Sequence, residues 1–107
     1  MAMSRLAAEW IRNTFTLPRR CEVIESDLSN GYLFLSILSQ LGKLSDEDME
    51  RASDETDPDV VLSNFGLLAR SLSSKLNIKI KQSDVANIVS ETPGAAAALV
   101  MKMKRWY

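Results

Sequence analysis

Apolar residues recur along most of the chain at the three- and four-residue spacing that is typical of amphipathic helices. The first such stretch covers residues 4–15, with Ser4 as the expected N-cap and Trp10 as its largest apolar anchor. Pro18 then ends the helix, because proline pushes the preceding residue out of the α-helical region. The stripe predicted to face the core consists of Leu6, Ala7, Trp10, Ile11 and Thr14.

The most hydrophobic segment covers residues 32–41 and is apolar on nearly every face. A helix of this kind belongs at the centre of a domain, because it has no polar side to present to water. Asp27, Ser29 and Asn30 come just before Gly31, and their short polar side chains can accept hydrogen bonds from the free amides of a helix start. Gly42 follows as a left-handed C-terminal stop.

Two further helices are predicted in the middle of the chain. Ser45 introduces a short acidic helix, which gives way to a loop before Asp57. Asp57 and Pro58 form a helix start signal, since an N-cap acid is followed by a proline at the first helical position. The amphipathic helix that follows is the longest in the chain and ends near Asn77. Its buried face is predicted to contain Val61, Phe65, Leu68, Leu72 and Leu76.

The last third of the chain is predicted to hold a connector and two helices. Residues 78–81 alternate between Ile and Lys, which favours an extended connector whose isoleucines enter the core while its lysines face water. The Ser-Asp pair at 83–84 is expected to cap a short helix, and the Thr-Pro pair at 92–93 a final helix over residues 95–107. The final helix is expected to bury Ala96, Leu99, Val100, Met103 and either Trp106 or Tyr107.

Together these elements predict an all-α fold. A chain of 107 residues has room for one domain with one core, and no repeat or linker divides it. We expect residues 1–107 to form this single domain as part of a longer protein, because the chain stops on an aromatic pair without a polar tail. The helices of residues 31–41, 58–76 and 95–107 are predicted to form the core, with Trp10 packing across them.

Charge is distributed unevenly, although 13 Lys and Arg nearly balance 14 Asp and Glu. Residues 44–59 hold eight of the acids and one of the bases, so the rest of the chain carries twelve bases against six acids. Basic side chains concentrate in the C-terminal third, where they would attract polyanionic partners. Alternatively, they only solvate the last helix and complement its dipole. The candidate partner-binding residues are Lys75, Lys79, Lys81, Lys102, Lys104 and Arg105.

Catalytic and metal-binding chemistry finds little support in the composition. The chain has no His and one Cys, which removes His-dependent triads, Cys–His pairs and the usual zinc ligand sets. The acidic run Asp46-x-Asp48-x-Glu50 imitates the start of a calcium loop, but Arg51 and Asp57 stand where that loop needs Gly and Glu. We therefore expect no enzyme activity, no metal site and no cofactor.

Nucleic acid and membrane partners are also disfavoured. The sequence pI is near 5.4 and the C-terminal bases are mostly lysine, whereas nucleic-acid readers are usually strongly basic. No apolar run approaches the roughly 20 residues needed to cross a bilayer.

Residues 19–21 are two arginines and the single cysteine of the chain, in the loop after the first predicted helix. Arg19 and Arg20 either face a partner or form local ion pairs with Glu22 and Glu25, and the local pairs are the favoured interpretation. Cys21 is expected to act as a small buried hydrophobic residue, and a single free thiol fits a reducing compartment.

Several short motifs occur in an order that resembles the calponin-homology-like domains of axonemal proteins. They are Asp-Leu-Ser-Asn-Gly-Tyr-Leu at 27–33, Asn-Phe at 64–65, Lys-Leu-Asn at 75–77 and Thr-Pro-Gly at 92–94, after a first helix that carries Trp10. The resemblance covers about the whole chain. It implies a calponin-homology-like helical bundle in the N-terminal part of a longer protein.

The resemblance also implies a function. It points to a non-catalytic anchoring module of a ciliary or flagellar axonemal protein, located in the cytoplasm at the cytoskeleton. The expected partners are microtubules, reached through the basic residues, or proteins of the axonemal central apparatus. Actin is disfavoured, because actin-binding relatives generally work as tandem domains. The remaining alternative is a dimerisation or protein-interaction domain that uses an exposed apolar patch including Trp106 and Tyr107.

Overall fold

The computed structural model describes residues 2–107, and this range contains helices and loops but no β-strand. The all-α fold predicted from the sequence is therefore confirmed. None of the helices described is long and apolar enough to span a lipid bilayer. In chain order they are α1 (Ala2–Thr14), α2 (Ile24–Asp27), α3 (Tyr32–Gln40), α4 (Asp46–Glu50), α5 (Pro58–Ser71), the π-helix η1 (Leu72–Leu76), α6 (Gln82–Val89) and α7 (Ala95–Trp106).

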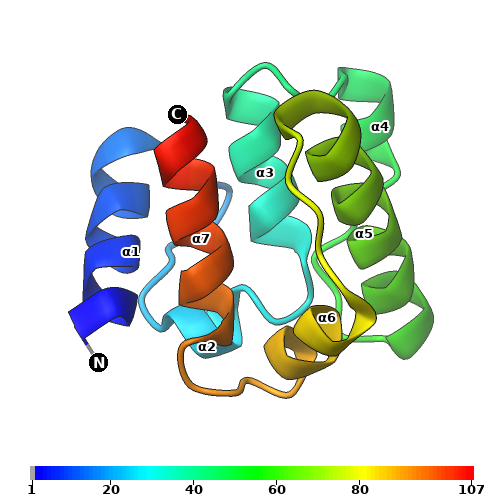
Figure 1. Ribbon diagram of the computed structural model, residues 1–107. Helices are drawn as coiled ribbons and strands as arrows, with labels where there is room; N and C mark the ends of the chain where they lie inside the picture. Colours follow the sequence, from blue (N-terminus) through cyan, green and yellow to red (C-terminus); the bar gives the residue numbers. More distant parts are fainter. Residues whose placement is uncertain (1) are drawn as a thin grey trace.

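The helices form two groups around one shared core (Figure 1). α1 packs alongside α7, and the short helix α2 contacts both of them. On the other side α3 packs against α4 and α5, while α6 lies against α7. A connector at residues 77–81 runs from the end of η1 across the front of the molecule to α6.

α3 is the central helix, as its composition predicts. All six residues from 33 to 38 are buried. Gly31 is the N-cap in a left-handed conformation with φ 84°, and Asn30 Oδ1 accepts from the Tyr32 amide at 3.0 Å. Gly42 follows the helix, also in the left-handed conformation with φ 74°, which confirms the predicted stop.

The core is built from the three helices predicted, with a contribution from α1. On α5 and η1 the predicted face is buried except for Val61, which is half-buried. On α7 neither aromatic residue is buried, since Trp106 is 40% exposed and Tyr107 is 65% exposed. The predicted core residues that the structure buries on these helices are Phe65, Leu68, Leu72, Leu76, Ala96, Leu99, Val100 and Met103.

Two expectations for the first helix are wrong. The helix begins two residues before Ser4, so this side chain lies within the helix, where its hydroxyl donates to Glu25 Oε2 at 3.3 Å. Leu6 was expected to face the core but is 52% exposed, whereas Ala7 and Ile11 are fully buried. The buried stripe is therefore narrower than the apolar stripe, because only part of α1 faces the rest of the molecule.

Trp10 is half-buried at the edge of the core rather than across it, which corrects the prediction for this residue. Its ring meets the ring of Phe15 edge-on with centroids 5.2 Å apart, and that of Tyr107 at 5.8 Å. These aromatic contacts join the C-terminal halves of α1 and α7.

The long helix starts as predicted and ends in an unexpected way. Asp57 Oδ1 accepts from the Asp59 amide at 2.9 Å, and Pro58 occupies the first helical position. The last five residues form η1, in which N–H groups bond five residues back instead of four. Asn77 then ends the helix in the left-handed conformation, with φ 56°.

The start of α7 at Ala95 is confirmed, whereas other details of the shorter helices differ from the prediction. α6 begins directly after Lys81, so Asp84 lies inside the helix and its Oδ2 accepts from the Lys81 amide at 2.9 Å. α7 begins after Gly94, which is left-handed with φ 85°, so Thr92 is not its N-cap. The one-turn helix α2, with Ile24 buried, was not predicted at all.

Candidate partner-binding surface

The six basic residues chosen from the sequence do not form one cluster. Lys79, Lys102 and Arg105 surround a shallow depression of about 360 Å³, together with Asn77 and Ile78. We call these three basic side chains the basic face.

The basic face forms where the connector passes α7. Ile78 and Ile80 are half-buried against the core, which leaves Lys79 exposed, as the alternation predicted. On α7, Lys102 and Arg105 are three residues apart and therefore share one side of the helix. The connector thus places its lysine beside two bases that are more than 20 residues away in the sequence.

Two other candidates, Lys81 and Lys104, do not line this depression. Lys81 follows Lys79 by two residues on the connector and so faces the same side, where α6 begins. Lys104 is two residues from Lys102, which is about 200° around an α-helix, so it lies on a different flank of α7.

Lys75 belongs to a different hollow. It lies on η1 and lines this hollow together with Lys43 and Arg70, neither of which the sequence singled out. No local pattern relates the three residues, because Lys43 follows α3 and the other two lie at the end of the long helix. Only the packing of these segments reveals the group.

The charges of the basic face are not neutralised within the domain. Among residues 2–107, none of the three has an acidic partner within 4.0 Å. Arg105 Nε donates at 3.4 Å to the Met101 carbonyl, and all three side chains are exposed. Their charge can therefore act on an external ligand.

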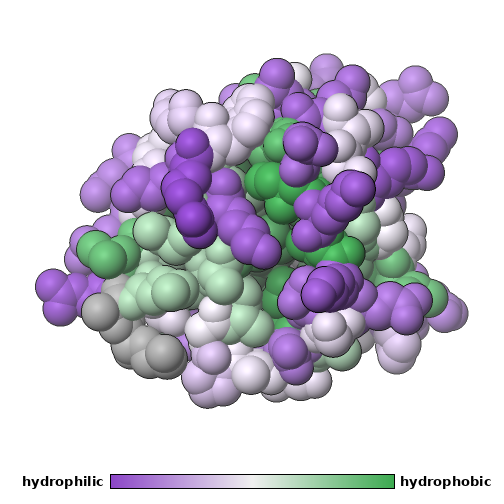
Figure 2. All heavy atoms as spheres, viewed as in Figure 1, coloured by the Kyte–Doolittle hydropathy of each residue, from purple (hydrophilic) through white to green (hydrophobic). Residues whose placement is uncertain are grey.

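An apolar groove adjoins the basic face. It has a volume of about 130 Å³, and its lining includes Ile80, Ile88 and Leu99, with Lys102 shared between groove and depression. In Figure 2 hydrophobic residues lie in the middle of this side of the molecule, with hydrophilic side chains on either side. A partner bound in this groove would meet apolar surface between the basic side chain of Lys102 and the acidic side chain of Asp84.

Arg19 has partners that the sequence did not indicate. Its Nη1 lies 2.8 Å from Asp27 Oδ1 and its Nε lies 2.6 Å from Asp54 Oδ2, whereas Glu22 and Glu25 were expected. The hydrogen bond from Arg19 lowers the pKa of Asp54, and the same bond raises the pKa of Arg19. Arg19 is thus a structural residue that links two loops, and the local pairing predicted for it is wrong.

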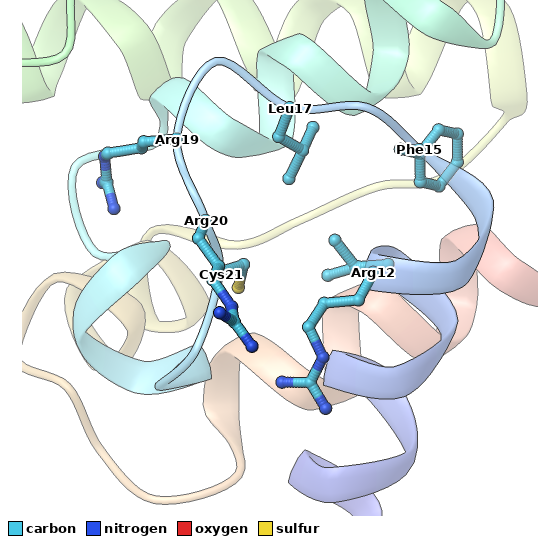
Figure 3. A pocket seen from close by; sticks show the side chains of 7 residues that line it. Arg12, Phe15, Leu17, Arg19, Arg20 and Cys21 are labelled. Carbon is cyan, nitrogen blue, oxygen red and sulfur yellow. The ribbon is translucent and has the colours of Figure 1, made fainter.

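A third hollow lies between α1 and the loop that follows it (Figure 3). Its volume is about 300 Å³, and Arg12 and Arg20 extend toward the same end of it. Arg20 Nε lies 3.2 Å from Glu22 Oε1, which confirms the local ion pair predicted for this residue. Cys21 is 1% exposed as expected, and burial raises the pKa of its thiol to about 11.

Comparison with known families assigns the fold. Residues 7–105 match the family described as the CH-like domain in sperm protein. The chain belongs to this family. The calponin-homology-like bundle inferred from the motifs is therefore confirmed, whereas no curated protein and no solved structure gives a significant match.

Membership of this family narrows the kind of function. A CH-like domain is a cytoskeleton-associated interaction module, and domains of this family are generally non-catalytic. The basic face, the adjoining groove and the hollow around Lys75 are accordingly candidate binding surfaces.

Proposed function

We propose that this domain anchors a ciliary or flagellar protein to the axoneme by docking its basic face on microtubules or on an acidic protein of the central apparatus. The observation that carries the proposal is the convergence of Lys79, Lys102 and Arg105 around one depression without acidic partners among the residues described. A surface of this sign attracts acidic partners, and the outer surface of tubulin is acidic. The family description, which names a sperm protein, supports an axonemal setting.

Within the family we propose a more specific relationship. The Gly-Tyr-Leu step at 31–33, the Asn-Phe pair at 64–65 and the Pro-Gly step at 93–94 resemble motifs in the N-terminal domain of sperm flagellar protein 2, a central-pair projection protein. On this proposal the domain is the N-terminal part of a longer protein that acts in the cytoplasm, at the axoneme of a cilium or flagellum.

Co-sedimentation with taxol-stabilised microtubules at low and high salt tests the docking proposal. We expect the domain to pellet at low salt and to be released at high salt, because exposed charge contacts are screened within about 10 Å at 0.1 M ionic strength. The triple variant K79E/K102E/R105E should lose pelleting at both salt concentrations. It should keep its far-UV circular dichroism spectrum, since all three side chains are exposed.

A matched control reverses three bases elsewhere. The variant R5E/R12E/R20E makes the same change in net charge on exposed residues of α1 and the loop after it, away from the basic face. It should pellet as the wild type does. Equal loss of pelleting in both variants would mean that net charge alone drives binding, and undiminished pelleting of K79E/K102E/R105E would contradict docking through this face.

A protein-interaction role without microtubules is the second candidate, favoured by the exposed Trp106 and Tyr107. Absence of pelleting at both salt concentrations would favour this second candidate, and light scattering over a concentration range would then show whether the domain self-associates. Actin filaments serve as the parallel arm of the sedimentation assay, where we expect no binding.

A further inference from the structure

The largest hollow described on the surface lies at the C-terminal end of the long helix that α5 and η1 form. It has a volume of about 520 Å³ and lies between the turn after α3 and the residues that end α5 and form η1. Three bases line it, one from the turn after α3 and two from the end of the long helix, together with three serines and one acid. They are Lys43, Arg70, Lys75, Ser45, Ser71, Ser74 and Asp48.

Positive charge in this hollow exceeds negative charge. Among residues 2–107 none of the three bases has an acidic partner within 4.0 Å. Asp48, the acid in the lining, already has Arg51 as a partner, with Oδ1 lying 3.7 Å from Nη1. Three like charges around one hollow repel one another, so an anion bound between them would be stabilised.

Two structural features involve residues that line this hollow. Lys43 Nζ lies 4.9 Å from the centroid of the Trp106 ring, in a cation–π contact that restricts its position. Lys75 and Ser74 lie on the π-helix, a geometry that is rare and that frequently marks functional sites.

We propose that this hollow binds a phosphate monoester carried by a phosphorylated serine or threonine of a partner protein. A phosphate monoester carries a charge of about −1.5 to −2 at neutral pH and has three acceptor oxygens. Arg70 and the two lysines match that charge, and Ser71 and Ser74 add neutral donors. A single carboxylate would neutralise only one of the three bases.

The proposal stands independently of the docking proposal. The two sites share no residue, since the depression is lined by Asn77, Ile78, Lys79, Lys102 and Arg105.

NMR titration of the ¹⁵N-labelled domain tests this inference. The probes are inorganic phosphate and N-acetyl-phosphoserine amide, with chloride and N-acetyl-serine amide as references at matched ionic strength. We expect saturable shifts confined to the amides of residues 43–45 and 70–75 with the phosphate probes alone. The double variant R70A/K75A should weaken binding by about tenfold or more, because two charge-assisted hydrogen bonds are lost.

The variant K79A/K102A is the matched control, because it removes the same number of charges from the basic face. It should bind phosphoserine as the wild type does, even if it loses microtubule pelleting, so that failure of one proposal is distinguishable from failure of the other. Because Arg70 and Lys75 are exposed, R70A/K75A should fold as the wild type does. The single variant K43Q provides a second test of the same hollow. Shifts that chloride reproduces, affinity unchanged in R70A/K75A, or binding to phosphoinositide vesicles without binding to phosphoserine would overturn the proposal.

Discussion

Asp54 and Asn64 show how single polar residues hold this domain together. Asp54 accepts from Arg19 at 2.6 Å and from Asn30 Nδ2 at 2.8 Å, so one carboxylate connects two loops. Asn64 is 1% exposed, and its Nδ2 donates at 2.9 Å to the carbonyls of Asn30 and Ser53. These bonds satisfy buried polar groups and fix the loop before α5 against the start of α3.

The ion pair of Asp54 predicts a pH-dependent contribution to stability. Replacing the carboxylate in D54N should lower the free energy of unfolding at pH 7 by about 1–2 kcal/mol, because a charge-assisted hydrogen bond is lost. The pKa of Asp54 is lowered in the folded state, so its stabilisation is present above the usual value of about 3.9 and is lost as the pH falls through the lowered pKa. The difference in the free energy of unfolding between D54N and the wild type, measured by urea unfolding, should therefore disappear below about pH 4.

The exposed neighbour Glu55 provides the control for this prediction. E55Q removes one carboxylate from the same loop, and within residues 2–107 that side chain has no basic partner within 4.0 Å. It should unfold as the wild type does at pH 7. If the free energies of unfolding of D54N and the wild type differ by the same amount from pH 7 to pH 3, the assigned role of the Asp54 charge is contradicted.

At the scale of helices, local signals located most elements but not all of their ends. Asp57 with Pro58 marked a true start, because the carboxylate and the proline act on the backbone within one turn. At α6 and α7 the helices start after Lys81 and after Gly94. At α6 one of the two suggested residues does cap the start, since Asp84 Oδ2 accepts from the Lys81 amide from inside the helix. At α7 no side chain caps the start, and Gly94 in the left-handed conformation stands there instead of Thr92.

The two glycines that flank α3 predict different costs for the same substitution. Both are left-handed, so G31A and G42A should each lose about 1–2 kcal/mol of stability from backbone strain. At Gly31 an added Cβ would also lie 3.1 Å from Asn64 Cβ and 3.3 Å from the Phe65 ring, whereas nothing lies within 4 Å at Gly42. G31A should therefore be the more destabilised protein, by a further amount of about 1–3 kcal/mol.

Thermal or urea unfolding of both variants measures this difference, and each glycine serves as the control for the other. Equal losses would show that the α5 side chains move aside at little cost. A larger loss in G42A would contradict the close approach of α3 and α5.

At the scale of the molecule, one core joins both groups of helices. Buried residues from α1, α3, α5 and α7 belong to a single cluster, and α1 and α7 are further joined by the contacts of Trp10, Phe15 and Tyr107. A small domain with one continuous core is expected to unfold in a single cooperative step.

Two spectroscopic probes test this cooperativity. Trp10 and Trp106 lie on α1 and α7, so tryptophan fluorescence reports on that side of the molecule, while far-UV circular dichroism reports on all helices. Urea unfolding followed by both signals should give the same midpoint. Loss of fluorescence at a lower urea concentration would show that the pair of α1 and α7 separates from the rest before the core is lost.

What could be predicted from the sequence depends on the distance over which each interaction acts. Helix periodicity, the cap at Asp57 and the buried residues of α3 and α7 involve neighbours three or four positions apart, which a single sequence displays directly. Arg20 found its predicted partner two residues away, but Arg19 paired with Asp54, 35 residues away. Sequence spacing carries no information about such a pair.

By itself, then, the sequence determined an all-α fold, the central place of α3 and the burial of Cys21, because these follow from hydrophobicity and local backbone geometry. The tertiary structure decided that Trp10 lies at the edge of the core, and that Leu6 faces outward. It also divided the basic residues between a face beside the connector and a hollow around Lys75. The physical reason is that a surface is assembled from segments far apart in the chain, and only their packing sets which charges become neighbours.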